Sequence, residues 1–203
     1  ALKSHKLFPL LNNRWNLRQN CRKIGLKTPE GYCGDTFAEV SAWAVMHNRF
    51  PLVMKSAKNS ADSDSIYLLK AFRELPQFYD EIKKAYPDAG VIIEDFVPAK
   101  ARIETTWLNG KLVMATQTGL SRSVYLYHAW RSYPVVIPAR FMNQIEAVAQ
   151  KFESLLALKE IPFRLSFCLG SANITLISLN AGLNRPEYFG RWNPSPLFGL
   201  PVE

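Results

Sequence analysis

Apolar positions recur along this chain with two different spacings, one typical of amphipathic helices and one typical of strands. Residues 13–25 place apolar side chains on one helical stripe, between an asparagine suited to cap a helix and a glycine suited to end one. Residues 36–47 repeat the pattern, with Thr36 and Glu39 spaced as a capping box. Residues 139–158 carry the longest apolar stripe. These three segments are predicted to be helices.

The segments between these helices have the composition of strands. Residues 51–55 form a short apolar run that ends in a lysine, and residues 90–97 form a second one bounded by glycine and proline. Residues 100–119 read as a hairpin with an Asn-Gly turn, and residues 162–180 alternate as a strand pair. A further helix is expected near 76–86, with Pro76 at its first position.

Helices that alternate with antiparallel strands predict an α+β fold. The chain contains no repeat, low-complexity tract or Gly/Ser linker, so any boundary falls in a short turn. We assign residues 1–95 to a first lobe and residues 96–203 to a second lobe, with antiparallel sheets and flanking helices.

The charge of the chain favours anionic partners. Lys and Arg number 25 against 17 Asp and Glu, a formal net charge of +8. These basic residues are scattered rather than massed, which favours a phosphate-binding cleft over an extended nucleic-acid surface. We therefore do not expect nucleic acid as a partner. An interaction module that binds some other anionic partner stays open on charge alone.

The cysteines and the chain ends bear on the cellular setting. The three cysteines form no C-x-x-C pair, so neither a disulfide framework nor a zinc site is indicated. No apolar run approaches the ~18 to 20 residues that span a bilayer, and the first residues lack the order of a signal peptide. We expect a soluble, cytoplasmic protein. Because the sequence begins with Ala, we also expect it to be part of a longer protein, with a preceding domain or a partner chain.

Four short phrases, in order along nearly the whole chain, carry a resemblance to a known family. They are "KIGLKTP" at Lys23–Pro29, "PLVMK" at Pro51–Lys55, "IIEDFV" at Ile92–Val97 and "LISLNAG" at Leu176–Gly182. In this order they resemble the ATP-grasp superfamily. The resemblance implies a two-lobed fold with a nucleotide cleft between the lobes, ATP as ligand, and ATP-dependent ligation of a carboxylate through an acyl-phosphate.

The resemblance also implies which residues meet the nucleotide. Lys55 would contact the phosphates, and Lys6 resembles the first lysine of the family; the alternative for Lys55 is an edge-strand lysine kept for solubility. The hinge between the lobes would enclose the adenine. The alternative is a buried central strand with a polar exit, and both can hold at once. The hinge residues are Ile92, Glu94, Asp95 and Phe96.

Basic residues in an aromatic connection are candidates for the acceptor side of the cleft. Arg122, His128 and Arg131 lie in "SRSVYLYHAWRSYP", and guanidinium groups suit planar carboxylates or phosphates. The alternative is a solvated basic loop that covers the core. No Ser, Cys or acidic neighbour in the sequence marks His128 as a base. The acceptor substrate is not identified.

The family holds Mg²⁺ with carboxylates on its last two strands, and the matching positions here are Ser166, Ser178 and Asn180. Hydroxyls lack the charge with which carboxylates neutralise this hard cation. No acidic residue occurs between Pro162 and Pro186, so a shifted alignment does not restore one. A displaced ligand set stays open. Its candidates are Asp62, Asp64, Glu94, Asp95 and Glu104.

Strand alternation places Arg164 on the same face as Ser166, and Leu176 on the same face as Ser178 and Asn180. A fixed Arg164 guanidinium near the metal position would neutralise phosphate without Mg²⁺, so nucleotide binding would be insensitive to chelator. We expect a degenerate ATP-grasp-like domain, a pseudoenzyme that binds a nucleotide. The alternative is an active ligase that forms C–N bonds with altered metal ligands.

Overall fold

The structure is a computed structural model that describes residues 12–58, 66–120, 128–156 and 161–181. In chain order its elements are α2 (Arg14–Lys23), β1 (Gly31–Gly34), α3 (Phe37–His47), β2 (Leu52–Ser56), β3 (Ile66–Leu69), the 3₁₀ turn η2 (Phe72–Glu74), α4 (Leu75–Ala85), β4 (Val91–Asp95), β5 (Ala101–Leu108), β6 (Lys111–Leu120), β7 (His128–Ser132), α5 (Ala139–Leu156), β8 (Phe163–Leu169) and β9 (Ile174–Ala181). The predicted α+β class is confirmed.

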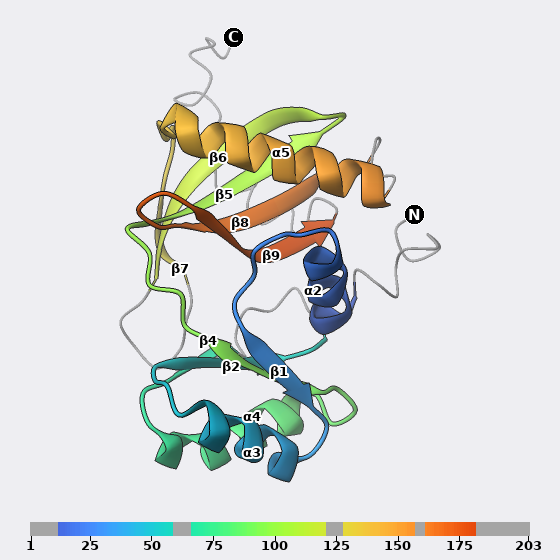
Figure 1. Cartoon of the computed structure of the whole chain (residues 1–203), viewed down its shortest axis with the longest axis vertical. Helices are drawn as coiled ribbons and strands as arrows, with labels where there is room; N and C mark the ends of the chain where they lie inside the picture. Colours follow the sequence, from blue (N-terminus) through green and yellow to red (C-terminus); the bar gives the residue numbers. More distant parts are fainter. Residues whose placement is uncertain (1–11, 59–65, 121–127, 157–160, 182–203) are drawn as a thin grey trace, which may run out of the picture.

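The first sheet has four antiparallel strands in the order β1-β4-β2-β3. Alternate residues of its strands, such as Met54 and Ile93, pack with apolar residues of α3 and α4 in one core. Both helices lie on the side of this sheet that is turned away from the second sheet (Figure 1). The remaining strand residues, which include Lys55 and Glu94, therefore face toward the second sheet.

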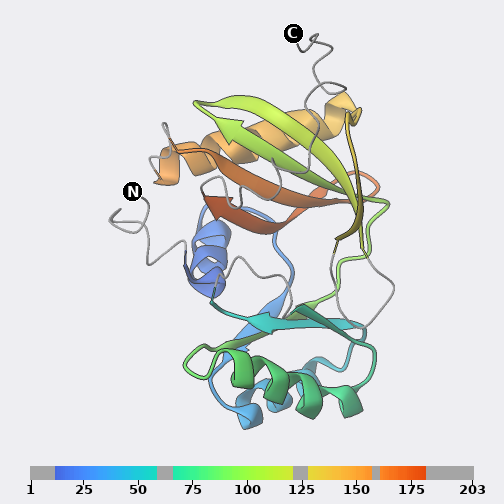
Figure 2. The same cartoon turned by 180° about the vertical axis from the view of Figure 1, so that it is seen from behind.

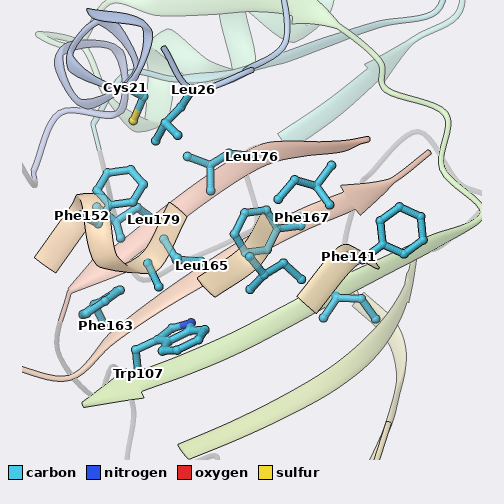
Figure 3. Packing of buried hydrophobic residues seen from close by; sticks show 14 of the residues in the cluster. Cys21, Leu26, Trp107, Phe141, Phe152, Phe163, Leu165, Phe167, Leu176 and Leu179 are labelled. Carbon is cyan, nitrogen blue, oxygen red and sulfur yellow. The ribbon is translucent and has the colours of Figure 1, made fainter. Parts of the chain in front are cut away.

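The second sheet has five antiparallel strands in the order β7-β6-β5-β8-β9, and α5 crosses one of its faces (Figure 2). Phe163, Leu165 and Phe167 of β8 point toward α5, where Phe152 and Phe141 meet them (Figure 3). The residues between them on β8 therefore lie on the opposite, polar face of the sheet.

Helix α2 lies between the two sheets, beside β9 and above β1 (Figures 1 and 2). Its Leu17 and Cys21 belong to the core of the second sheet, whereas Arg14 and Arg18 reach the first. We placed this segment with the first lobe; the boundary between residues 95 and 96 stays a prediction.

Two local sequence signals are confirmed, one at the start of a helix and one at a hairpin turn. The Thr36 side chain accepts from the Glu39 backbone and the Glu39 carboxylate accepts in return, so the capping box is confirmed. Asn109 and Gly110 both take positive φ, of 51° and 70°, at the turn of the β5–β6 hairpin.

Two strands lack a clear sequence signal and were missed. β1 carries glycine at both ends, and its Gly31 packs so tightly on Glu94 that an added Cβ would lie 2.7 Å from the Glu94 Cβ. β7 lies in the stretch that we expected to be a connection. β1 forms by pairing with β4, far along the chain, whereas β7 pairs with the strand that precedes it, β6.

The expected face of Leu176 is wrong. Ser178 pairs with Ser166, but Leu176 pairs with Phe167, so Ile177 is an extra residue at a β-bulge. Leu176 consequently joins the core, while Ser178 shares the polar face of Ser166.

None of the described helices has the length and apolarity needed to cross a bilayer.

Candidate functional site

A buried group of three charged side chains occupies the face of the first sheet that looks toward the second sheet. The Lys55 Nζ lies 2.8 Å from Glu94 Oε1, and Arg18 of α2 donates to the other oxygen, Oε2. Only 5% of Lys55, 5% of Arg18 and 2% of Glu94 is exposed. We call these residues the Lys55–Glu94–Arg18 triad. Lys55 is therefore no exposed edge-strand lysine.

The triad is held together by the attraction between opposite charges, and its side chains are almost fully buried. Burial alone would raise the pKa of Glu94, but the charges of Lys55 and Arg18 overcome this and bring its pKa below the usual range. Burial lowers the pKa of Lys55 to about 8; Glu94 opposes this shift, and Arg18 and Arg14 add to it. Two cations share one carboxylate, so one positive charge remains uncompensated inside the triad.

Arg14 adds a second positive charge beside the triad. Its Nη1 donates to the Ser56 carbonyl at 3.1 Å, and its backbone N–H donates to the Ala57 carbonyl at 2.7 Å. The end of β2 is thereby tied to the start of α2. Among the described residues, this region carries three cationic groups and a single carboxylate, as an anion-binding site would.

The other predicted hinge residues lie on both sides of Glu94 along the chain. Ile92 is fully buried, Asp95 accepts from His47 at 2.7 Å, and Arg102 of β5 lies 5.6 Å above the Phe96 ring. The hinge is therefore fixed by contacts to α3 on one side and to the second sheet on the other.

The polar face of the second sheet carries a row of side chains in strand register. Thr116 on β6 pairs with Glu104 on β5, Glu104 with Ser166 on β8, and Ser166 with Ser178 on β9. Directly paired residues of antiparallel strands project on the same side, so the four side chains form one line. The expected metal positions Ser166 and Ser178 are neighbours in this line.

Arg164 and Arg131 both reach the carboxylate in that row. Arg164 Nη1 lies 3.3 Å from Glu104 Oε1, and Arg131 Nη2 lies 3.7 Å from Oε2. Asn180 is the cross-strand partner of Arg164. Arg164, Ser166, Ser178 and Asn180, which the sequence singled out, are thus brought together.

These residues do not fit Mg²⁺. The paired positions Ser166 and Ser178 offer hydroxyls, Asn180 offers an amide, and the adjacent carboxylate of Glu104 is engaged by two guanidinium groups. Mg²⁺ is usually bound in proteins through one or two carboxylates together with phosphate and water oxygens. In the part of the chain that the structure describes, no three His, Cys, Asp or Glu side chains are grouped to hold a metal ion.

The polar face of the second sheet meets the connection between β4 and β5 at Cys168. Its Sγ lies 3.9 Å from the Val97 carbonyl just after the hinge. Burial raises the pKa of this thiol; the charge of Arg102 opposes the shift and that of Glu94 adds to it. The thiol on β8 is therefore within electrostatic range of the triad carboxylate on β4.

Several sequence candidates cannot be placed. Lys6, Arg122, Asp62 and Asp64 lie outside the described residues, and of His128 only the backbone, in β7, is described. A cavity of about 500 Å³ opens elsewhere, at the start of α2 and the turn after α4, and none of the predicted site residues lines it.

Arg14 and Arg18 are the functional candidates that we missed. They are one turn apart on α2, on the face next to its apolar stripe, and Arg18 is buried together with that stripe. A basic pair at that spacing is the signal that would have found them, although a solvated helix face often looks the same.

Solved structures with the same arrangement of elements come from ATP-grasp proteins and related ligases. The D-alanine–D-alanine ligase of Bacillus anthracis complexed with ATP superposes with a TM-score of 0.67 at 14% identity, over 84% of this chain and 55% of that one. A biotin carboxylase domain of Hydrogenobacter thermophilus 2-oxoglutarate carboxylase, in complex with MgADP, gives 0.73 at 15% identity over 97% and 44%. A RimK domain ATP-grasp protein of Sphaerobacter thermophilus gives 0.64 at 16% over 91% and 64%.

No protein-family model and no curated protein sequence matches the chain. At these identities the likeness shows the fold, and the predicted ATP-grasp-like fold is confirmed. The chain spans about half the length of the first structures that it matches.

Proposed function

We propose that this chain is a degenerate ATP-grasp-like domain that binds ATP between its two sheets through fixed cationic side chains, without efficient ligase catalysis. It would work as a nucleotide-binding part of a larger protein. The observation that carries the proposal is the row Glu104–Ser166–Ser178: two hydroxyls stand where carboxylates would hold Mg²⁺, and the remaining carboxylate is occupied by Arg164 and Arg131.

The charge arrangement supports an anionic ligand. Arg14 and the triad residues Lys55 and Arg18 outnumber the one carboxylate beside them, Glu94, and a buried uncompensated cation is costly. A phosphate group at this position would lower that cost. On the other sheet, Glu104 fixes the guanidinium of Arg164, which would replace a metal ion as the phosphate's counter-charge.

Calorimetric titration of ATP into the protein, with Mg²⁺ and separately with EDTA, tests the proposal. We expect the same dissociation constant in both conditions, and no release of ADP over hours. Binding that strictly requires Mg²⁺, or no binding at all, would refute it. Lys55→Met should abolish the heat of binding, whereas Lys70→Met, which removes an exposed lysine just after β3 of the same sheet, should leave it unchanged.

The second candidate function is an active ATP-dependent carboxylate–amine ligase with displaced metal ligands. One observation favours it: Glu104 projects from the same face, one strand away from Ser166. In that case ADP and phosphate should form in the presence of an amine and a carboxylate acceptor, and Glu104→Gln should stop their formation.

A further inference from the structure

We infer that Arg18 is a positioning residue: by occupying one oxygen of Glu94, it keeps the charge of Lys55 available to an anionic ligand. This inference rests on the proposed nucleotide site and specifies which residue sets its affinity. Neither the sequence motifs nor the likeness to solved structures assigns a role to Arg18.

The carboxylate of Glu94 lies between two cationic side chains. Its two carboxylate oxygens have different partners, Lys55 at Oε1 and Arg18 at Oε2, and the whole group is almost sealed from water. An isolated Lys55–Glu94 pair would be neutral and would offer little to a phosphate. With Arg18 present, the triad carries a net charge of +1.

Arg18 links the two sheets. It comes from α2, whose Leu17 and Cys21 are anchored in the core of the second sheet, while its guanidinium crosses to the first sheet. The helix backbone, held again by Arg14 at Ser56, therefore delivers the charge at a fixed place. Arg18 is thus positioned before any ligand arrives, which limits the ordering cost of binding.

The charged groups that face the ammonium of Lys55 are Glu94 on β4 and Arg14 and Arg18 on α2. A lysine ammonium has three donors, and among the described contacts Glu94 accepts from it. The other donors of the ammonium can bind a phosphate oxygen, provided that Arg18 engages the second oxygen of Glu94 and so limits the attraction of Glu94 for Lys55.

Charge-matched variants separate this role from simple packing. Arg18→Met lowers the net charge of the triad to zero and should weaken ATP binding in EDTA by at least about tenfold, since a unit charge is lost at short range in a poorly screened site. Arg18→Met/Glu94→Gln restores the net charge of +1 and should recover most of the affinity. Arg18→Lys, which keeps the charge, should bind as the native protein does.

The pKa of Lys55, followed by NMR in protein carrying ¹³C-labelled lysine, gives a readout that does not depend on ATP. It should rise in Arg18→Met, because a cation that opposed ionisation is gone, and fall again in the double variant, because the carboxylate is gone too. Arg18→Gln makes the same change of charge and takes the place of Arg18→Met if that variant does not fold.

The outcomes are distinct. Native affinity in Arg18→Met, a double variant as weak as Arg18→Met, or an unchanged pKa of Lys55 in Arg18→Met would each overturn the inference. If the native protein binds no ATP, the proposed function fails, and the pKa of Lys55 alone still decides whether Arg18 acts on it.

Discussion

Glu104 on β5 is the direct cross-strand partner of Ser166 on β8, and its carboxylate is the acidic group in the row that continues to Ser178. The carboxylate of Glu104 forms ion pairs with two guanidinium groups, those of Arg164 and Arg131, and no second carboxylate stands in the row beside it. The polar face of the second sheet is therefore organised around ion pairs.

Adding carboxylates to this row should create a metal site. In Ser166→Asp/Ser178→Glu, three carboxylates would line one face, the donor set that Mg²⁺ prefers. Mg²⁺ at ten times its Kd should then stabilise the variant by about 1.4 kcal/mol in a thermal unfolding assay. The uncharged Ser166→Asn/Ser178→Gln variant should show no response to Mg²⁺, and an equal response in both would contradict the prediction.

Removal of Arg164 should destabilise the fold more than removal of Arg131. Arg164 is the closer of the two to Glu104, at 3.3 Å against 3.7 Å, and is the more buried. Leaving a buried carboxylate with one weaker partner should cost about 1 to 3 kcal/mol in Arg164→Met. Urea unfolding of the two methionine variants measures the difference; a larger loss in Arg131→Met would show that the geometry of the pair is not decisive.

Loss of Arg164 should also weaken ATP binding in EDTA, if its guanidinium replaces the metal charge. Arg164→Lys keeps the charge and loses the planar fork, so we expect an affinity between those of the native protein and Arg164→Met. Calorimetry in EDTA gives the three values. Equal affinities in all three would remove Arg164 from the nucleotide site.

The stability of the protein should depend on the protonation of Lys55 in alkaline solution. Its pKa is about 8 in the fold, against about 10.4 for an exposed lysine. Between these two values unfolding takes up a proton, so the contribution of Lys55 makes the free energy of unfolding rise with pH.

The difference in unfolding free energy between the native protein and Lys55→Met isolates this contribution. It should increase from pH 8 toward pH 10.4 and be flat below pH 8. Subtraction removes the contributions of the buried thiols Cys21 and Cys33, whose pKa burial raises to about 11. If this difference did not change with pH, the pKa of Lys55 in the fold would be that of an exposed lysine, which would contradict the prediction.

The capping box of α3 should be worth a measurable amount of stability. Thr36→Ala removes the side chain that accepts from the Glu39 backbone, and should cost about 1 kcal/mol in urea unfolding. Thr36→Ser keeps the hydroxyl and should cost far less. Equal losses in the two variants would assign the effect to the methyl group and not to the cap.

Some of the fold was readable from local patterns because the responsible interactions are local. The Thr36–Glu39 box and the Asn109–Gly110 turn involve neighbours in sequence, and the apolar stripes of α2 and α5 repeat within single helices. β1 was not readable, since it is held chiefly by hydrogen bonds to a distant strand, β4, and β7 was not readable because its basic and aromatic stretch has no clear strand pattern, although it pairs with the preceding strand β6. The bulge at Ile177 depends on the register between β8 and β9, which strict alternation cannot reveal.

The sequence by itself determined that the expected metal positions 166, 178 and 180 carry Ser, Ser and Asn, so that no carboxylate stands there. It also placed Lys55 and Glu94 at the ends of apolar strands. Only the tertiary structure decided that Arg18 meets Glu94 and that Arg164 meets Glu104, pairs separated by 76 and 60 residues. The physical reason is that charge pairing acts through space. A single sequence records which side chains carry charge, whereas the packing of α2 between the two sheets and the pairing of β5 with β8 decide which charges meet.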